Sequence, residues 1–195
     1  AVDAEQGLLT QGSSQALDLV ARRLVKPGDV VLVDDPGYPN LLFMLRFAGA
    51  HPVGVPRTAS GYDLPVLEAL LATHRPTVFF AQPRLQSPTC SVASVAHLHR
   101  LLQLAEQHDF MLVENDIYAD MDAGVRPSLA SLDQLQRVIY LGSFSKTISP
   151  YLRTGFLAAR RDLLDELVQL KMVSGLTSSE ITERITFGVV TDGRW

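Results

Sequence analysis

Short apolar runs alternate with longer amphipathic segments along most of this 195-residue chain. The runs VVLV (30–33) and VIYL (138–141) are apolar at consecutive positions, so both faces of each strand would be buried. Strands of this kind belong to mostly parallel sheets that carry helices on both sides. The alternation therefore predicts an α/β fold, a three-layer α/β/α sandwich around a mostly parallel sheet.

The same pattern gives the expected position of each element. Ala16, Leu17 and Val20 recur at helical spacing, which predicts an amphipathic helix over 13–25. Further helices are expected at 40–48, 64–74, 92–108 and 162–173. Strands are expected at 30–33, 51–56, 77–81, 110–114, 137–141 and 155–159, and 7–12 is expected to form a short strand or turn.

The composition limits the class of protein. Hydrophobic residues make up 47% of the chain and charged residues 19%, which is typical of a globular domain with a core. A net charge of −4 without a basic cluster gives no sign of direct nucleic-acid binding. No apolar stretch reaches the roughly 20 residues that span a membrane, and no secretory signal is visible. The single cysteine, Cys90, excludes an internal disulfide and suits a reducing cytoplasm, where we expect the protein. The chain starts without Met and ends without a terminal cap or tail, so we expect it to be one part of a longer protein.

Polar and chemically active residues follow the expected strands. Ligands of open parallel sheets bind outside the carboxyl ends of the strands, so these segments are where a site is expected. Together they offer serines, an aromatic ring, carboxylates, a phenol, a lysine and an arginine. The segments are 12–15, 34–39, 82–90, 114–120 and 143–146, with Arg153 shortly after the last.

Taken in order, five motifs resemble those of fold-type I pyridoxal-phosphate (PLP) enzymes of the class I/II aminotransferase group. The motifs read GSSQALDL, DPGYP, PRLQSPTC, ENDIY and GSFSKTISPYLR. They are most similar to the aminotransferase-like domain of MocR-type regulators in the GntR family. The resemblance implies that 1–175 form the PLP-binding large domain and that 176–195 begin the connection to a C-terminal small domain.

The resemblance implies that Lys146, in SFSK, forms a Schiff base with PLP. Such a lysine must present a neutral amine for part of the cycle, and burial or a nearby cation favours that form. Once a substrate displaces it, the same amine is placed to move a proton between the substrate α-carbon and the cofactor. Ser145 belongs to the same cofactor-binding segment.

The resemblance also implies a phosphate site. Arg153 would grip the phosphate dianion with its planar fork of donors, and Ser143 would add a hydroxyl. Gly12, Ser13 and Ser14 lie where a loop enters a helix, and the free N–H groups of a helix N-terminus attract a phosphate.

Three further residues are implied to contact the pyridine ring. Asp116 would lie beneath the ring nitrogen and keep it protonated, although Glu114 and Asp120 compete for this role. The resemblance implies that Tyr118 hydrogen-bonds the phenolic oxygen, and residues i and i+2 of a strand-like segment share a face, so Asp116 and Tyr118 could both reach one ring. Tyr38 would stack on the ring.

The chain departs from the family pattern at two positions. Ser87 stands where many members carry an asparagine that donates to the phenolic oxygen, and the shorter serine, with one donor, is expected to tune the electronics of the cofactor less efficiently. Cys90 replaces a glycine that often supports a positive φ, so this turn is expected to be altered. No motif positions a histidine near Cys90, which argues against a nucleophilic role.

The candidate residues also have structural interpretations. Lys146 could extend from the surface, and Arg153 could pair with a surface acid. Ser13 or Ser14 could simply cap a helix, and Tyr38 could pack on the helix that follows it. Other kinds of site have no support, because GxGxxG, GxSxG, CxxC and HxxxH are all absent.

Three functions remain open at this point. The first is transamination of an amino acid by a homodimeric parent enzyme. The second is sensing of an amine or aldehyde in a MocR-type regulator, whose winged helix-turn-helix would precede Ala1 and bind DNA. The third is cofactor binding without chemistry, which the departures at Ser87 and Cys90 favour. The sequence before Ala1 would separate the first two, and no membrane partner is expected.

Overall fold

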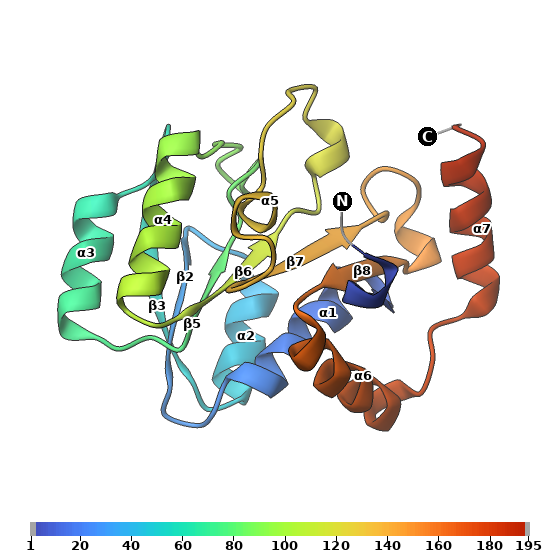
Figure 1. Cartoon of the computed structure of the whole chain (residues 1–195), viewed down its shortest axis with the longest axis horizontal. Helices are drawn as coiled ribbons and strands as arrows, with labels where there is room; N and C mark the ends of the chain where they lie inside the picture. Colours follow the sequence, from blue (N-terminus) through green and yellow to red (C-terminus); the bar gives the residue numbers. More distant parts are fainter. Residues whose placement is uncertain (1–2, 194–195) are drawn as a thin grey trace.

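The computed structural model describes residues 3–193 and shows one eight-stranded sheet between two layers of helices (Figure 1). Its strands are β1 (Gly7–Thr10), β2 (Val30–Asp35), β3 (His51–Thr58), β4 (Gly61–Tyr62), β5 (Val78–Ala81), β6 (Met111–Asn115), β7 (Val138–Ser143) and β8 (Gly155–Ala158). They lie in the order β1-β8-β7-β6-β5-β2-β3-β4. Neighbours from β7 to β3 are parallel, whereas β8 is antiparallel to β1 and β7 and β4 is antiparallel to β3. The expected mostly parallel α/β sheet is confirmed.

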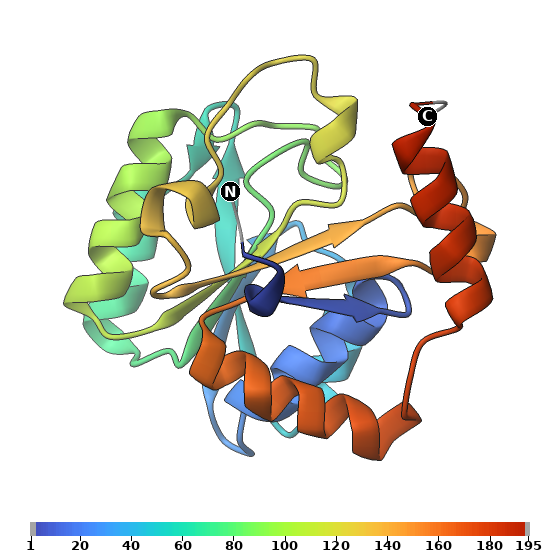
Figure 2. The same ribbon diagram turned by 45° about the vertical axis from the view of Figure 1, so that its right-hand side comes forward.

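Helices cover both faces of this sheet (Figure 2). The α-helices are α1 (Gly12–Leu24), α2 (Pro39–Phe47), α3 (Leu64–Thr73), α4 (Val95–Gln107), α5 (Leu129–Asp133), α6 (Arg161–Gly175) and α7 (Glu180–Thr191). Short 3-10 turns are η1 (Ala4–Gln6), η2 (Ala119–Met121) and η3 (Pro150–Leu152). Helices α1, α2 and α6 pack on one face, and α3, α4 and α5 pack on the other.

The sequence pattern missed β4, α5 and α7. Strand β4 has two residues and α5 has five, so neither is long enough to show a periodicity. Helix α5 depends instead on a capping box between Ser128 and Ser131. Helix α4 begins at Val95 rather than at 92, because the side chain of Ser94 caps it by accepting the N–H of His97.

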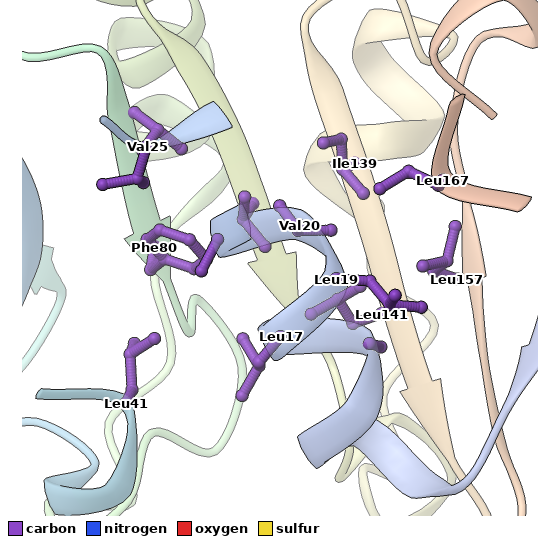
Figure 3. Packing of buried hydrophobic residues seen from close by; sticks show 14 of the residues in the cluster. Leu17, Leu19, Val20, Val25, Leu41, Phe80, Ile139, Leu141, Leu157 and Leu167 are labelled. Atoms are coloured by element: carbon purple, nitrogen blue, oxygen red, sulfur yellow. The ribbon is translucent and has the colours of Figure 1, made fainter. Parts of the chain in front are cut away.

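The core beneath α1 fixes the position of that helix. Leu17, Leu19 and Val20 are fully or almost fully buried against the strands (Figure 3). Phe80 and Leu141 belong to the same cluster. Burial of each such side chain contributes about 1.5–3 kcal/mol, so the start of α1 is held firmly beside the ends of the strands.

The topology brings the polar strand-end segments to one edge. Strands β1 and β7 are both antiparallel to β8, so they run in the same direction as each other. The carboxyl ends of β1, β2, β5, β6 and β7 therefore meet at one edge of the sheet, and β8 begins there. The loops that the sequence singled out after these strands are neighbours in space.

Helix α7 stands apart from the sheet and lies against η3 (Figure 1). The Thr186 hydroxyl of α7 donates to the Thr154 hydroxyl at 3.0 Å. Helix α6 ends at Gly175, and Leu176 follows with φ 56°. The division at residue 175 stays a prediction. Within residues 3–193, every helix is too short or too polar to cross a membrane.

Buried Glu114 links the sheet to α5. It is 2% exposed, and its carboxylate accepts the backbone N–H groups of Leu129 at 2.8 Å and Ala130 at 2.9 Å. These are the first two residues of α5, so Glu114 satisfies two N–H groups in addition to the capping box of Ser128 and Ser131. Burial raises the pKa of Glu114 to about 7.

We expect ionisation of Glu114 to lower the free energy of unfolding as the pH rises from about 4.3 to about 7. A folded-state pKa near 7, above the unfolded value of about 4.3, adds stability at low pH that is lost as the pH passes 7. Glu114→Gln keeps an acceptor but cannot ionise, so its free energy of unfolding should fall less between about pH 5 and about pH 8. Urea denaturation at both pH values measures this difference. An equal fall in the variant and the wild type would contradict the assignment.

Candidate functional site

A pocket of about 280 Å³ opens at the edge where the strand ends meet. Most of the residues that the sequence singled out line it. These are Ser13, Ser14, Tyr38, Ser87, Tyr118, Ser143, Ser145, Lys146 and Arg153. They come from five separate segments of the chain, so the fold, and not local sequence, assembles the pocket.

The start of α1 forms one wall. Gln11 occupies the N-cap position and no side chain caps the helix. Ser13 and Ser14 therefore lie within the first turn and do not cap it, which removes that alternative interpretation. The N–H groups of a first turn lack helical partners and carry partial positive charge, so this wall attracts an anion.

Gly12 allows Arg153 to approach this wall. A Cβ added at Gly12 would lie 2.6 Å from Nη2 of Arg153, and the φ of Gly12 is +72°. Nη2 of Arg153 donates to the carbonyl of Gln11 at 3.3 Å. The residue Gly12 does not line the pocket itself, but its lack of a side chain brings the guanidinium to the end of the helix.

Ser143 lies on the same side of the sheet. Ile139 and Leu141 of β7 pack in the core beneath α1, and the alternation of the strand places Ser143 on that face. Its hydroxyl accepts the N–H of Ser145 at 3.2 Å. A hydroxyl, a guanidinium and a helix N-terminus thus converge, which is the donor set that binds a phosphate.

Lys146 is in the turn that follows β7, and its side chain is exposed within the pocket. Its Nζ lies 6.0 Å from the centroid of the Tyr118 ring. The hydroxyl of the adjacent Ser145 is buried without a hydrogen-bond partner. A primary amine therefore faces the phosphate-binding wall across a space large enough for a small aromatic ligand.

Asp116 is not in this pocket. It is 3% exposed, its carboxylate accepts the Tyr140 hydroxyl at 3.1 Å, and it lies 3.5 Å from Nε of Arg84. Burial raises its pKa, while the charge of Arg84 opposes the shift. Asp116 lines a different hollow, of about 700 Å³, together with Arg84 and Arg126.

The position of Asp116 follows from the alternation of β6. Val113 packs in the core beneath α1, so Asn115, two residues later, turns to the pocket and Asp116 turns away. The strand ends at Asn115, and a turn then brings Tyr118 back to the pocket. The expectation that Asp116 and Tyr118 share a strand face is wrong, because neither residue is in the strand.

Tyr38 and Ser87 also line the pocket. Tyr38 is 37% exposed, and its hydroxyl accepts a hydrogen bond from Nδ2 of Asn40 at 2.9 Å. The N–H of Ser87 donates to the side-chain oxygen of Gln82 at 3.2 Å. Cys90 is exposed with φ 55°, so the cysteine adopts the backbone conformation that a glycine there would favour.

The profile of the aminotransferase class I and II family matches residues 1–193. The chain belongs to this family. A 2-aminoadipate transaminase of Thermus thermophilus is 35% identical over 98% of the chain and 50% of that protein. A probable rhizopine catabolism regulatory protein, MocR, of Rhizobium meliloti is 31% identical over 97% of the chain and 38% of its own length.

Solved aminotransferase structures have the same fold. The α-aminoadipate aminotransferase of Thermus thermophilus, complexed with N-(5'-phosphopyridoxyl)-L-leucine, superposes with a TM-score of 0.92 at 34% identity. That match covers 97% of the chain and 50% of the solved structure. The chain therefore spans about half the length of these aminotransferase relatives.

The residues present fit PLP, the cofactor that membership of the aminotransferase family implies. The close approach of Arg153 over Gly12 and the uncapped α1 suit its phosphate. The amine of Lys146 suits its aldehyde. Sequence reasoning missed Gln82 and Asn115, which also line the pocket. Counting the alternation forward from buried Val113 would have found Asn115.

Proposed function

We propose that this chain is a PLP-binding large domain in which Lys146 forms the covalent link to the cofactor. The observation that carries the proposal is the pocket itself, where the amine of Lys146 faces Arg153, Ser143 and the uncapped start of α1. When bound, PLP supplies an electron-withdrawing ring that stabilises negative charge at the substrate α-carbon.

The residues of the chain then have separate roles. Arg153, Ser143 and the first turn of α1, with Ser13 and Ser14, hold the phosphate. Tyr38 and Tyr118 line the pocket, where Tyr38 would contact the ring face and Tyr118 the phenolic oxygen. Ser87 and Ser145 offer further hydroxyls. With the cofactor bound, the neutral amine of Lys146 would carry the proton that moves between the substrate α-carbon and the cofactor.

The parent protein is proposed to transaminate an amino acid as a cytoplasmic homodimer, with residues 176–195 leading to its small domain. The relative named 2-aminoadipate transaminase supports this function. The second candidate is an effector-sensing domain of a regulator that binds DNA through a separate module, and the MocR relative favours it. Formation of a 2-oxo acid from amino acids by the full-length parent would support the first, and amine-dependent DNA binding without turnover the second.

The proposed cofactor link can be tested directly on the chain. PLP should produce a visible absorbance band, and borohydride reduction should then fix the cofactor to Lys146 in a peptide map. Attachment at other lysines only, or none, would contradict the proposal. The chain has three lysines, Lys26, Lys146 and Lys171, so each site is resolved by mass.

Gly12→Ala should weaken PLP binding at least about tenfold, which corresponds to about 1.4 kcal/mol. The added methyl group meets Nη2 of Arg153 at 2.6 Å and pushes the guanidinium from the phosphate site. Gly28→Ala is the matched control, because Gly28 also has a positive φ of +89° but no atom within 4 Å of an added Cβ. Absorbance titration should show weaker binding only for Gly12→Ala. Equal affinities in the two variants would contradict the phosphate assignment.

A further inference from the structure

The pocket holds cations but no acid among the residues that the structure places around it. Its charged side chains are Lys146 and Arg153, and the remaining lining residues are neutral. The resemblance to PLP enzymes implies a carboxylate beneath the ring nitrogen. The acids nearest to the pocket in the sequence are the buried carboxylates at the strand ends, Asp34, Glu114 and Asp116.

Each of these buried acids faces the opposite layer of helices. Glu114 accepts hydrogen bonds from the start of α5, and Asp116 accepts one from Tyr140. Asp34 accepts the N–H of Gln82 at 2.9 Å, and its other oxygen lies 3.9 Å from Nη1 of Arg57. All three carboxylates are engaged away from the pocket, so none is placed to meet a ligand there.

Asn115 is the polar side chain that the end of β6 presents to the pocket. It is the last residue of β6 and turns to the pocket side, and its Oδ1 is buried without a hydrogen-bond partner. The neighbouring amide, Gln82, is already used, since it donates to the carbonyl of Leu85 and accepts the N–H of Ser87. In PLP the ring nitrogen lies across the ring from the aldehyde carbon, hence away from Lys146. The side chain of Asn115, with its unpaired Oδ1, is the polar group left to meet it.

We propose that Asn115 hydrogen-bonds the pyridine nitrogen of PLP and that this nitrogen stays unprotonated. The inference rests on the proposed function. An amide carries no charge at any physiological pH, so it cannot compensate a pyridinium, and the two cations of the pocket disfavour a third. A half-turn of the amide about its Cβ–Cγ bond exchanges Oδ1 with Nδ2, so the side chain can present its N–H and donate to the bare nitrogen.

This arrangement makes the ring a weaker acceptor of electrons than a protonated ring. The site then binds an amino group covalently but favours removal of its α-proton less strongly. Slow proton removal suits prolonged capture of an amine effector, which is the second candidate function. The chain's own residue at the end of β6 thus biases the site toward recognition over turnover.

Nitrogen NMR of PLP labelled at the ring nitrogen tests the inference without measuring activity. The cofactor is first fixed to the chain by borohydride. The wild-type chain should show the chemical shift of an unprotonated pyridine at neutral pH. Asn115→Asp should raise the pH at which this nitrogen titrates by about 1–3 pH units, because a carboxylate favours the charged ring. Asp116→Asn, the adjacent acid that faces away, should leave the titration unchanged.

The outcomes separate the two proposals. Attachment at Lys146 together with a protonated ring nitrogen in the wild type would overturn this inference and leave the proposed function standing. A lower titration point in Asp116→Asn would also overturn it, because the role would return to Asp116. Failure to attach PLP to Lys146 would overturn the proposed function and this inference with it. The wild-type spectrum decides the question even if Asn115→Asp does not fold.

Discussion

Lys146→Ala should abolish covalent attachment of PLP to the chain. Lys146 presents the exposed primary amine that lines the pocket, and alanine has no nucleophile to replace it. The phosphate-binding wall of α1 and Arg153 lies on other segments and remains, so the variant should still bind PLP weakly and reversibly. Mass spectrometry after borohydride reduction should show the added cofactor in the wild type and none in the variant.

The other two lysines supply the controls. Lys26 is exposed in the turn before β2, outside the pocket, so Lys26→Ala should retain full attachment. Lys171 is 8% exposed, and its Nζ donates to the Leu9 carbonyl at 2.8 Å and to the Ser178 hydroxyl at 2.9 Å. Its amine is therefore engaged in the core. Undiminished attachment in Lys146→Ala, mapped to Lys26 or Lys171, would disprove the role of Lys146.

The fold could be predicted because the signals of its main elements are long. Strands such as β2 and β7 are apolar at successive positions, and α1 repeats apolar residues over its full length. Their order then determines a mostly parallel sheet with covered faces. Helix α5 escaped prediction because it has only five residues and depends on a distant contact as well as on its capping box, since Glu114 on β6 supplies acceptors for its first N–H groups.

The sequence motifs predicted which segments form the candidate site, but not the direction of every side chain. Residues in the turns after β7 and before β8, such as Lys146 and Arg153, could be placed at the sheet edge from order alone. The face of the sheet to which each side chain points could not be predicted from this order, because the face alternates with every residue along a strand. One residue separates Asn115 in the pocket from Asp116 in the opposite layer. Choosing between them required the register of Val113 in the core.

Asp34→Leu should destabilise the chain by about 3–5 kcal/mol at about pH 8. Asp34 is 7% exposed, and Nη1 of the buried Arg57 lies 3.9 Å from its Oδ1. Burial raises the pKa of Asp34 to about 7 despite the opposing charge of Arg57, so the carboxyl is mostly ionised above that pH. The substitution leaves a buried guanidinium without its counter-charge. Denaturation in guanidinium chloride measures the loss of free energy.

Removal of the cation should cost less than removal of the acid. In Arg57→Met the remaining carboxyl of Asp34 can take up a proton and become neutral, whereas the guanidinium left by Asp34→Leu cannot lose its charge. Arg57→Met still loses the contact with the Tyr62 ring, 4.2 Å from the guanidinium carbon, and the bond to the Ser91 hydroxyl. The expected order of stability is therefore wild type, Arg57→Met, Asp34→Leu. The reverse order of the two variants would show that Asp34 does not stabilise the buried guanidinium of Arg57.

Asp34→Asn separates the charge of this pair from its connection to the pocket. The amide oxygen of asparagine can still accept the N–H of Gln82, which Asp34 accepts at 2.9 Å, and Gln82 in turn holds the N–H of Ser87. This variant should lose stability because Arg57 is unpaired, but its affinity for PLP should stay closer to that of the wild type than the affinity of Asp34→Leu. If both variants lose affinity equally, the buried ion pair itself, and not the hydrogen bond to Gln82, shapes the pocket.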